Sequence, residues 1–153
     1  MDVNVFNWSL LHKYYPKFSL SEESFKNILE KYLGSYTEDN VNFIFVSKAY
    51  IEGLNSQYRS KNYPTDVLSF EIKSNDILGE VYICPEYISE NYPEEEIFRT
   101  AVHGFLHLLG YDHTENFLGK GKNIEEIFVM QENILQNILH EINNRTGEPR
   151  EEI

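Results

Sequence analysis

Residues 66–84 read DVLSFEIKSNDILGEVYIC. Two runs rich in apolar side chains, Asp66 to Ile72 and Leu78 to Cys84, have the length and composition of β-strands. The polar residues 73–76 between them are typical of a turn. The stretch therefore predicts a β-hairpin.

Two further strands and several helices are expected around this hairpin. Val3 to Trp8 alternates enough to form an edge strand, and Val41 to Val46 is rich in β-branched and aromatic residues. Capping residues, acidic first turns and apolar periodicity predict helices at Ser21 to Leu33, from Ser47 to about Tyr58, from Pro93 to about Leu109 and at Asn123 to Ile142. The pattern indicates an α+β fold, a single compact domain with a small mixed sheet of about four strands and four or five helices.

The composition sets the class of protein. We expect one domain over residues 1–143, followed by a flexible C-terminal tail at residues 144–153, which are polar and contain Gly147 and Pro149. The single Cys84 excludes a disulfide framework or a thiolate metal cluster and suits a reducing cytosol. No apolar run approaches the roughly eighteen residues of a membrane span, and residues 1–10 lack the pattern of a secretory signal. The sequence therefore predicts a cytoplasmic protein that makes no membrane contact.

Residues 103–113, which read HGFLHLLGYDH, carry the predicted chemistry. His103 and His107 are four residues apart on a predicted helix, so they point from the same face. Gly110 allows the chain to leave the helix in a left-handed turn, which lets His113 return toward the same point. Three converging imidazoles suit one Zn²⁺ ion with a fourth position open for water. We therefore predict a zinc site at the end of the penultimate long helix.

The histidine spacing leaves two rival functions open. It is also the spacing of metzincin proteases, in which a Glu general base follows the first His. Gly104 occupies that position here, which disfavours peptide hydrolysis but leaves another zinc hydrolase, a protease or an amidohydrolase, as an alternative. The second rival is a non-catalytic ribosome-assembly factor with a structural zinc, whose fourth ligand would be a carboxylate such as Glu80 or Asp112.

Arg59 and three carboxylates are the other candidate site residues. The Arg59 guanidinium offers a planar set of donors that matches a phosphate, although an Arg in a loop is usually only solvated. Glu80, Asp66 and Asp112 lie near the motifs and could transfer protons or orient metal ligands. Asp112 is better explained as a structural residue beside a turn, and Asp66 as a residue that begins a strand.

Three motifs in sequence order resemble the YbeY family, bacterial zinc-dependent endoribonucleases of ribosomal RNA maturation. They are LNSQYRSKNYPTDVLSF at 54–70, LGEVYI at 78–83 and HGFLHLLGYDH at 103–113, and QENIL at 131–135 resembles the family's last helix. The resemblance implies that His103, His107 and His113 bind the metal and that Arg59 is needed for activity. It also implies cleavage of single-stranded RNA in maturation of the 3′ end of small-subunit (16S) rRNA and in ribosome quality control. The implied partners are precursor rRNA, the ribosome or its small subunit, and associated assembly factors.

The charge distribution is compatible with that implication. The formal net charge of −12 disfavours a protein that coats nucleic acid indiscriminately. The two motif-bearing segments, residues 48–73 and 101–122, are nevertheless the ones without a net negative charge. We therefore expect weak, salt-sensitive RNA contact through a small local patch and the metal, with the ribosome or a partner supplying specificity.

Overall fold

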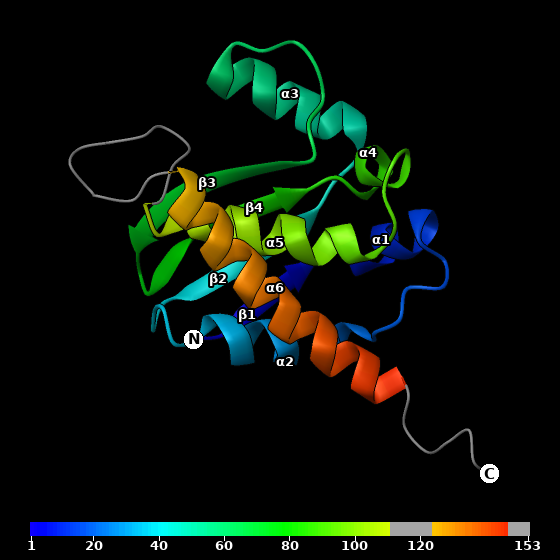
Figure 1. Cartoon of the computed structure of the whole chain (residues 1–153). Helices are drawn as coiled ribbons and strands as arrows, with labels where there is room; N and C mark the ends of the chain where they lie inside the picture. The colour runs from blue at the N-terminus through cyan, green and yellow to red at the C-terminus, as the bar shows by residue number, and fades with distance from the viewer. Residues whose placement is uncertain (111–123, 147–153) are drawn as a thin grey trace.

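A four-stranded mixed β-sheet forms one layer of the molecule. The computed structural model describes residues 1–110 and 124–146. The strands are β1 (Val3–Phe6), β2 (Asn40–Phe45), β3 (Val67–Ser74) and β4 (Ile77–Ile83), in the order β1-β2-β4-β3. β1, β2 and β4 are parallel, whereas β3 pairs antiparallel with β4. The predicted α+β fold with a small mixed sheet is confirmed (Figure 1).

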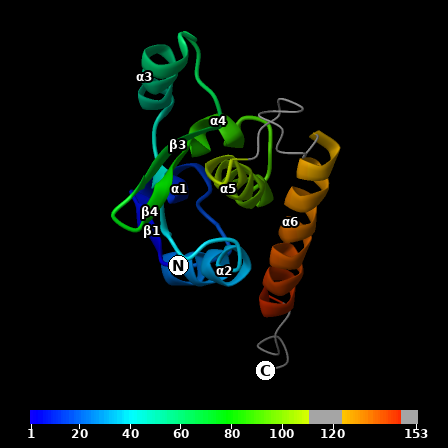
Figure 2. The ribbon, with the colours of Figure 1, turned by 90° about the vertical axis from the view of Figure 1, so that its left-hand side faces the viewer.

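Six helices belong to the described part of the chain. Their bounds are α1 (Trp8–Tyr14), α2 (Glu22–Leu33), α3 (Lys48–Arg59), α4 (Pro85–Ser89), α5 (Glu95–Leu108) and α6 (Ile124–Thr146). Helices α5 and α2 pack on one face of the sheet, and α6 crosses both of them to form an outer layer (Figure 2). Helix α5 therefore lies between the sheet and α6, which explains why its apolar side chains are buried all around its axis.

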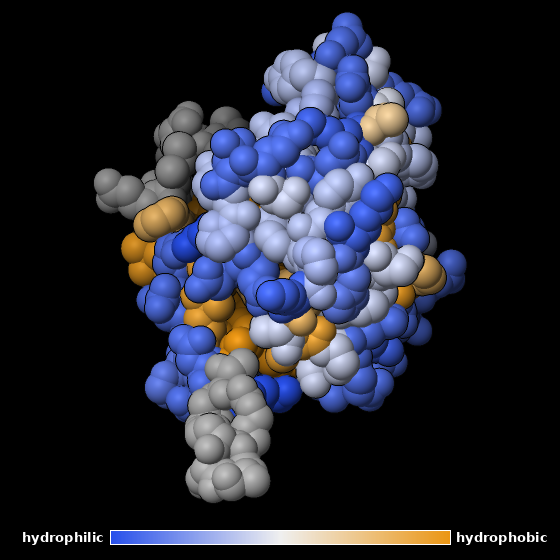
Figure 3. Space-filling model, turned by 90° about the vertical axis from the view of Figure 1, so that its right-hand side faces the viewer, coloured by the Kyte–Doolittle hydropathy of each residue, from blue (hydrophilic) through white to orange (hydrophobic). Residues whose placement is uncertain are grey.

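The central core lies between the sheet and these helices. Alternate residues of β2 and β4 point into it, including Phe43, Phe45 and Val81, and none of these three is exposed to solvent. A smaller apolar cluster on the opposite face of the sheet includes Ile51 of α3 and Leu68 of β3. Outside these cores, the face in Figure 3 is mostly hydrophilic, with apolar residues in small patches between polar ones.

The capping and turn residues behave largely as their chemistry predicts. Ser21 accepts a hydrogen bond from the amide of Ser24 and caps α2, and Ser47 caps α3 in the same way through Tyr50. The β3–β4 hairpin is confirmed, and Asn75 and Asp76 at its turn both have positive φ angles.

Two element boundaries and two short helices differ from the sequence-based expectations. β1 ends at Phe6, because Asn7 adopts a left-handed conformation with φ 65° and the short helix α1 follows at once. The sequence patterns predict neither α1 nor the five-residue helix α4. Helix α6 continues through Thr146, so the predicted tail begins inside the helix, and residues 147–153 lie outside the described residues. Among the described helices, none is long and apolar enough to cross a membrane.

Candidate functional site

His103 and His107 form a close pair on one face of α5. They stand one helical turn apart, and their Nε2 atoms are 3.0 Å from each other. Both residues are half-buried, and the two ring centroids are 4.6 Å apart. The predicted convergence of these two imidazoles on one point is therefore present in the structure.

Gly104 allows α5 to lie directly against the sheet beside this pair. A Cβ atom at position 104 would be 2.5 Å from Cγ1 of Val81 and 3.0 Å from Oγ of Ser69. The Ser69 hydroxyl also donates a 2.9 Å hydrogen bond to the Gly104 carbonyl oxygen. A side chain at this position would point into the sheet, so the site does not have room for the glutamate base that metzincin proteases carry there.

The end of α5 also follows its sequence. The helix ends at Leu108, and Gly110 has a φ angle of 99°, the left-handed turn that its position predicts. His113 and Asp112 lie outside the described residues. Among residues 1–110 and 124–146, no group of three His, Cys, Asp or Glu side chains is arranged to hold a metal ion.

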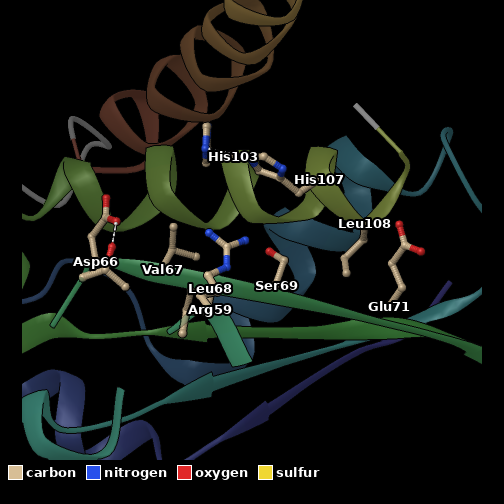
Figure 4. A pocket seen from close by; sticks show the side chains of 10 residues that line it. Arg59, Asp66, Val67, Leu68, Ser69, Glu71, His103, His107 and Leu108 are labelled. Carbon is tan, nitrogen blue, oxygen red and sulfur yellow. Dashed lines mark hydrogen bonds between the residues drawn. The ribbon is translucent and has the colours of Figure 1, made fainter. Parts of the chain in front are cut away.

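A cleft of about 520 Å³ opens beside the histidine pair. Its walls come from α5, the start of β3 and the end of α3, and its lining residues are Arg59, Thr65, Asp66, Val67, Leu68, Ser69, Glu71, His103, His107 and Leu108. Figure 4 shows the Arg59 guanidinium extending toward the helix that carries the two histidines. The fold thus brings Arg59 and the histidines, which are far apart in sequence, to one cavity.

The loop after α3 fixes the position of Arg59. Helix α3 ends at this residue, and Ser60 follows in the left-handed conformation with φ 57°. The buried Asn55 holds the loop through two hydrogen bonds. Its side-chain amide donates to the backbone carbonyl of Tyr63, and its backbone carbonyl accepts from the backbone amide of Lys61. The Arg59 side chain itself is exposed, which leaves its guanidinium available to a ligand in the cleft.

Asp66 and Glu80, two of the candidate carboxylates, occupy opposite sides of the sheet. Asp66 lies immediately before β3, accepts a hydrogen bond from Thr65 Oγ1 at 3.1 Å and lines the cleft. Glu80 alternates with Val81 on β4, so it points away from α5 and accepts a 2.8 Å hydrogen bond from the Tyr82 hydroxyl. The predicted proton-transfer or ligand-orienting role of Glu80 is therefore not supported by its position, whereas Asp66 is well placed.

Gln131, Glu132 and Arg99 form a polar cluster behind His103. Gln131 of α6 is 6% exposed, and its Oε1 atom lies 2.7 Å from Nδ1 of His103. Its Nε2 atom donates to Glu132, which also accepts a bidentate pair of hydrogen bonds from Arg99 of α5. The hydrogen bonds from Arg99 lower the pKa of the Glu132 carboxyl, so this group is a carboxylate at neutral pH.

Comparison with known proteins identifies the family. A family model described as endoribonuclease YbeY matches residues 12–139. A protein named endoribonuclease YbeY from Thermotoga maritima is 35% identical over 133 residues, which cover 83% of this chain and 84% of that protein. The chain belongs to the YbeY family. Two other proteins named endoribonuclease YbeY are also similar to it. The one from Persephonella marina is 35% identical and the one from onion yellows phytoplasma is 36% identical, each over 146 residues. These matches cover 86% and 84% of this chain and 93% and 94% of those proteins.

The fold agrees with membership of the YbeY family. A solution structure of a Thermotoga maritima protein superimposes with a TM-score of 0.58 and 31% sequence identity. The match covers 94% of this chain and 93% of that one. The chain is thus a member of an endoribonuclease family. The part of the chain that the family model matches includes Arg59, His103, His107 and Gln131.

The positions of His103 and His107 in this YbeY family member fit two ligands of a zinc ion. Two nitrogens that each lie about 2.0–2.1 Å from a tetrahedral zinc are about 3.3 Å apart, close to the 3.0 Å between the Nε2 atoms. The Nδ1 atom of His103 is hydrogen-bonded to a side chain from another helix, as is usual for metal-binding histidines. Sequence reasoning missed Gln131, although a buried polar residue among the apolar positions of α6 is a signal that could have found it.

Proposed function

We propose that this protein is a metal-dependent endoribonuclease that cleaves single-stranded regions of RNA. We further propose that it acts in the cytoplasm on the 3′ end of precursor small-subunit rRNA and in ribosome quality control. The observation that carries the proposal is the facing pair of His103 and His107 Nε2 atoms in the wall of a cleft that Arg59 also lines. Family membership supports RNA as the substrate.

One Zn²⁺ ion is the proposed metal, and its ligands would be His103, His107 and His113. Zinc bound in an open site supplies Lewis acidity, which makes water a stronger nucleophile and polarises a phosphoryl oxygen. The pairing of the two described nitrogens, and the outer hydrogen bond from His103 to Gln131, support this assignment. His113 remains a prediction from the sequence.

Arg59 is proposed to bind the phosphate at the cleavage site. Its guanidinium is exposed, lines the cleft and extends toward the histidine-bearing helix (Figure 4). A guanidinium can donate two parallel hydrogen bonds to phosphate oxygens. Because negative charge grows on these oxygens as the phosphodiester is cleaved, Arg59 would stabilise the transition state more than the bound substrate.

Asp66 is the carboxylate in the cleft that we propose to transfer a proton or to orient a metal ligand. It lies immediately before β3 and lines the same cleft as Arg59 and His103. Thr65 supports one of its oxygens through a hydrogen bond, which leaves acceptor capacity for a hydroxyl or water in the cleft. Asp112 remains a sequence-based candidate for a structural or ligand-orienting role.

The proposed partners come from the resemblance to the YbeY family, and the charge of the chain is compatible with them. A net charge of −12 disfavours tight, sequence-independent RNA binding, while Arg59 and the metal provide a local site for phosphate. We propose that the ribosome, its small subunit or an assembly factor supplies the specificity for the correct RNA. Binding of random RNA by the isolated protein should accordingly be weak and should weaken further as salt rises.

A cleavage experiment with matched histidine variants tests this function. The substrate is an RNA hairpin with single-stranded tails, and zinc per chain is measured on the same samples. We expect cleavage within the tails, loss of cleavage with a chelator, and its return when zinc is added. His107→Ala should lose both zinc and cleavage, whereas His140→Ala on the exposed face of α6 should keep both.

The same experiment distinguishes the rival functions. A chelated protein that cleaves RNA at the parental rate would disprove metal dependence. Zinc-dependent casein hydrolysis without RNA cleavage would favour a protease, and bound zinc without either activity would favour a structural metal. The RNA ends identify the nucleophile, because a 2′,3′-cyclic phosphate forms only when the 2′-hydroxyl attacks.

A further inference from the structure

A chain of hydrogen bonds connects Arg99 to His103 across the contact between α5 and α6. Arg99 donates to both oxygens of Glu132, from Nε at 3.0 Å and from a terminal nitrogen at 3.2 Å. The side-chain amide of Gln131 donates to Glu132 at 3.1 Å, and its Oε1 lies 2.7 Å from His103 Nδ1. This series of hydrogen bonds ends at Nδ1 of His103, the ring nitrogen that does not face His107.

The carboxylate of Glu132 determines which way the Gln131 amide points. A carboxylate can only accept hydrogen bonds, so the group facing it at 3.1 Å must be the NH₂ of Gln131. A flipped amide would instead place its oxygen against Glu132 with no proton between them. Because Glu132 is itself held in place by the two hydrogen bonds from Arg99, the Gln131 oxygen is directed at His103.

The direction of the Gln131 oxygen in turn determines the tautomer of His103. An amide oxygen is also only an acceptor, so the 2.7 Å contact requires a proton on His103 Nδ1. In the neutral ring the lone pair is then on Nε2, the atom that lies 3.0 Å from His107 Nε2. Gln131 is 6% exposed, so water competes little with this hydrogen bond.

We propose that Gln131 is a positioning residue that holds His103 in its Nδ1–H tautomer, and that the Arg99–Glu132 pair fixes the Gln131 amide for this purpose. The ring is then ready to bind a metal through Nε2 before the metal arrives. The purpose assigned to the tautomer rests on the zinc site proposed above. The tautomer itself is a property of the metal-free protein and can be measured without zinc or RNA.

Three variants separate the hydrogen bond from the packing of α6. Gln131→Leu keeps a buried side chain of similar size but removes the acceptor. Gln136→Leu is the matched control, because it makes the same change at an exposed position of the same helix. Glu132→Leu leaves Gln131 in place but frees its amide to flip.

The readouts are the His103 tautomer and the affinity for zinc. Long-range ¹H–¹⁵N spectra of the metal-free protein at about pH 8 distinguish the two neutral tautomers. We expect Nδ1–H in the parent and in Gln136→Leu, and an increased Nε2–H population in Gln131→Leu and Glu132→Leu. Zinc affinity, measured by competition with a chromophoric chelator, should fall about 10- to 100-fold in Gln131→Leu and should be retained in Gln136→Leu.

The inference would be overturned by an Nε2–H tautomer in the parent, or by Gln131→Leu leaving the tautomer unchanged. A changed tautomer with unchanged zinc affinity would refute the positioning role. These outcomes are separate from the proposed function. A parent protein that shows the expected tautomer and binds zinc, but does not cleave RNA, would refute the nuclease proposal and leave the role of Gln131 intact.

Discussion

Ser69 of β3 donates a 2.9 Å hydrogen bond to the carbonyl oxygen of Gly104, in the middle of α5. This bond joins the strand that lines one wall of the cleft to the helix that carries His103 and His107. The contact is close because Gly104 has no side chain between the helix and the sheet. The distance between the two walls of the cleft is therefore fixed at this residue.

Replacing Gly104 should destabilise the protein despite the higher helix propensity of other residues. In Gly104→Ala the new Cβ would be 2.5 Å from Val81 Cγ1, so the helix must move or the valine must change its rotamer. We expect the free energy of unfolding to fall by about 1–3 kcal/mol, measured by urea denaturation. Gly53→Ala is the control, because nothing lies within 4 Å of its Cβ, and it should gain up to about 1 kcal/mol. Equal effects at the two glycines would contradict the close contact.

Arg59 should be needed for RNA cleavage but not for metal binding. We expect Arg59→Ala to lower kcat/KM for a single-stranded RNA by about 10²-fold or more, with zinc per chain unchanged. Arg59→Lys should recover only part of the loss, because an ammonium cannot donate the paired hydrogen bonds of a guanidinium. Lys61→Ala removes a neighbouring exposed cation that does not line the cleft, and should change the rate by less than about threefold. Parental cleavage by Arg59→Ala would disprove phosphate binding by this residue.

Asp66 and Glu80, the two candidate carboxylates in the described part of the chain, should differ in their importance for RNA cleavage. Asp66→Asn keeps the shape of the side chain but removes its charge from the cleft, so we expect cleavage to fall at least about 10-fold with zinc retained. Glu80→Gln lies on the opposite face of the sheet and should cleave RNA at the parental rate. Single-turnover rates of the two variants, measured side by side, provide the comparison. A larger loss in Glu80→Gln than in Asp66→Asn would show that position in the fold is a poor guide to their roles.

Glu141 should make the attachment of α6 to α2 sensitive to acid. Hydrogen bonds from Tyr32 and Lys31, followed by Arg145, lower the pKa of its carboxyl from about 4.5 to about 2. Since the folded protein has the lower pKa, this carboxylate contributes its full stability above about pH 4.5 and loses it as the pH falls toward 2. The contribution should be less than about 1 kcal/mol, because Glu141 and its partners are near the surface.

The Glu141 prediction is tested by the difference in unfolding free energy between the parent and Glu141→Gln. That difference should shrink between about pH 4.5 and pH 2, measured by urea denaturation at each pH. A constant difference over this range would mean that the carboxyl is not stabilised by Tyr32 and Lys31 in the folded state.

Local chemistry explains which parts of the fold could be predicted. The hairpin, the two serine caps and the left-handed Gly110 depend on residues within a few positions of each other, so the sequence is sufficient for them. The short helices α1 and α4 were not predicted, because seven and five residues give too little periodicity to recognise. The placement of Glu80 depends on which side of β4 faces the helices, and nearby residues do not reveal this.

The amino-acid sequence was enough to predict the fold class, the family and the spacing that puts His103 and His107 on one face of a helix. These features follow from backbone preferences and the period of the α-helix, which act over short distances. Only the tertiary structure placed Arg59 and Asp66 in the histidine cleft, turned Glu80 away from it, and put Gln131 against His103. The reason is that each of these relationships joins different elements, and the packing of α5 between the sheet and α6 decides which side chains meet.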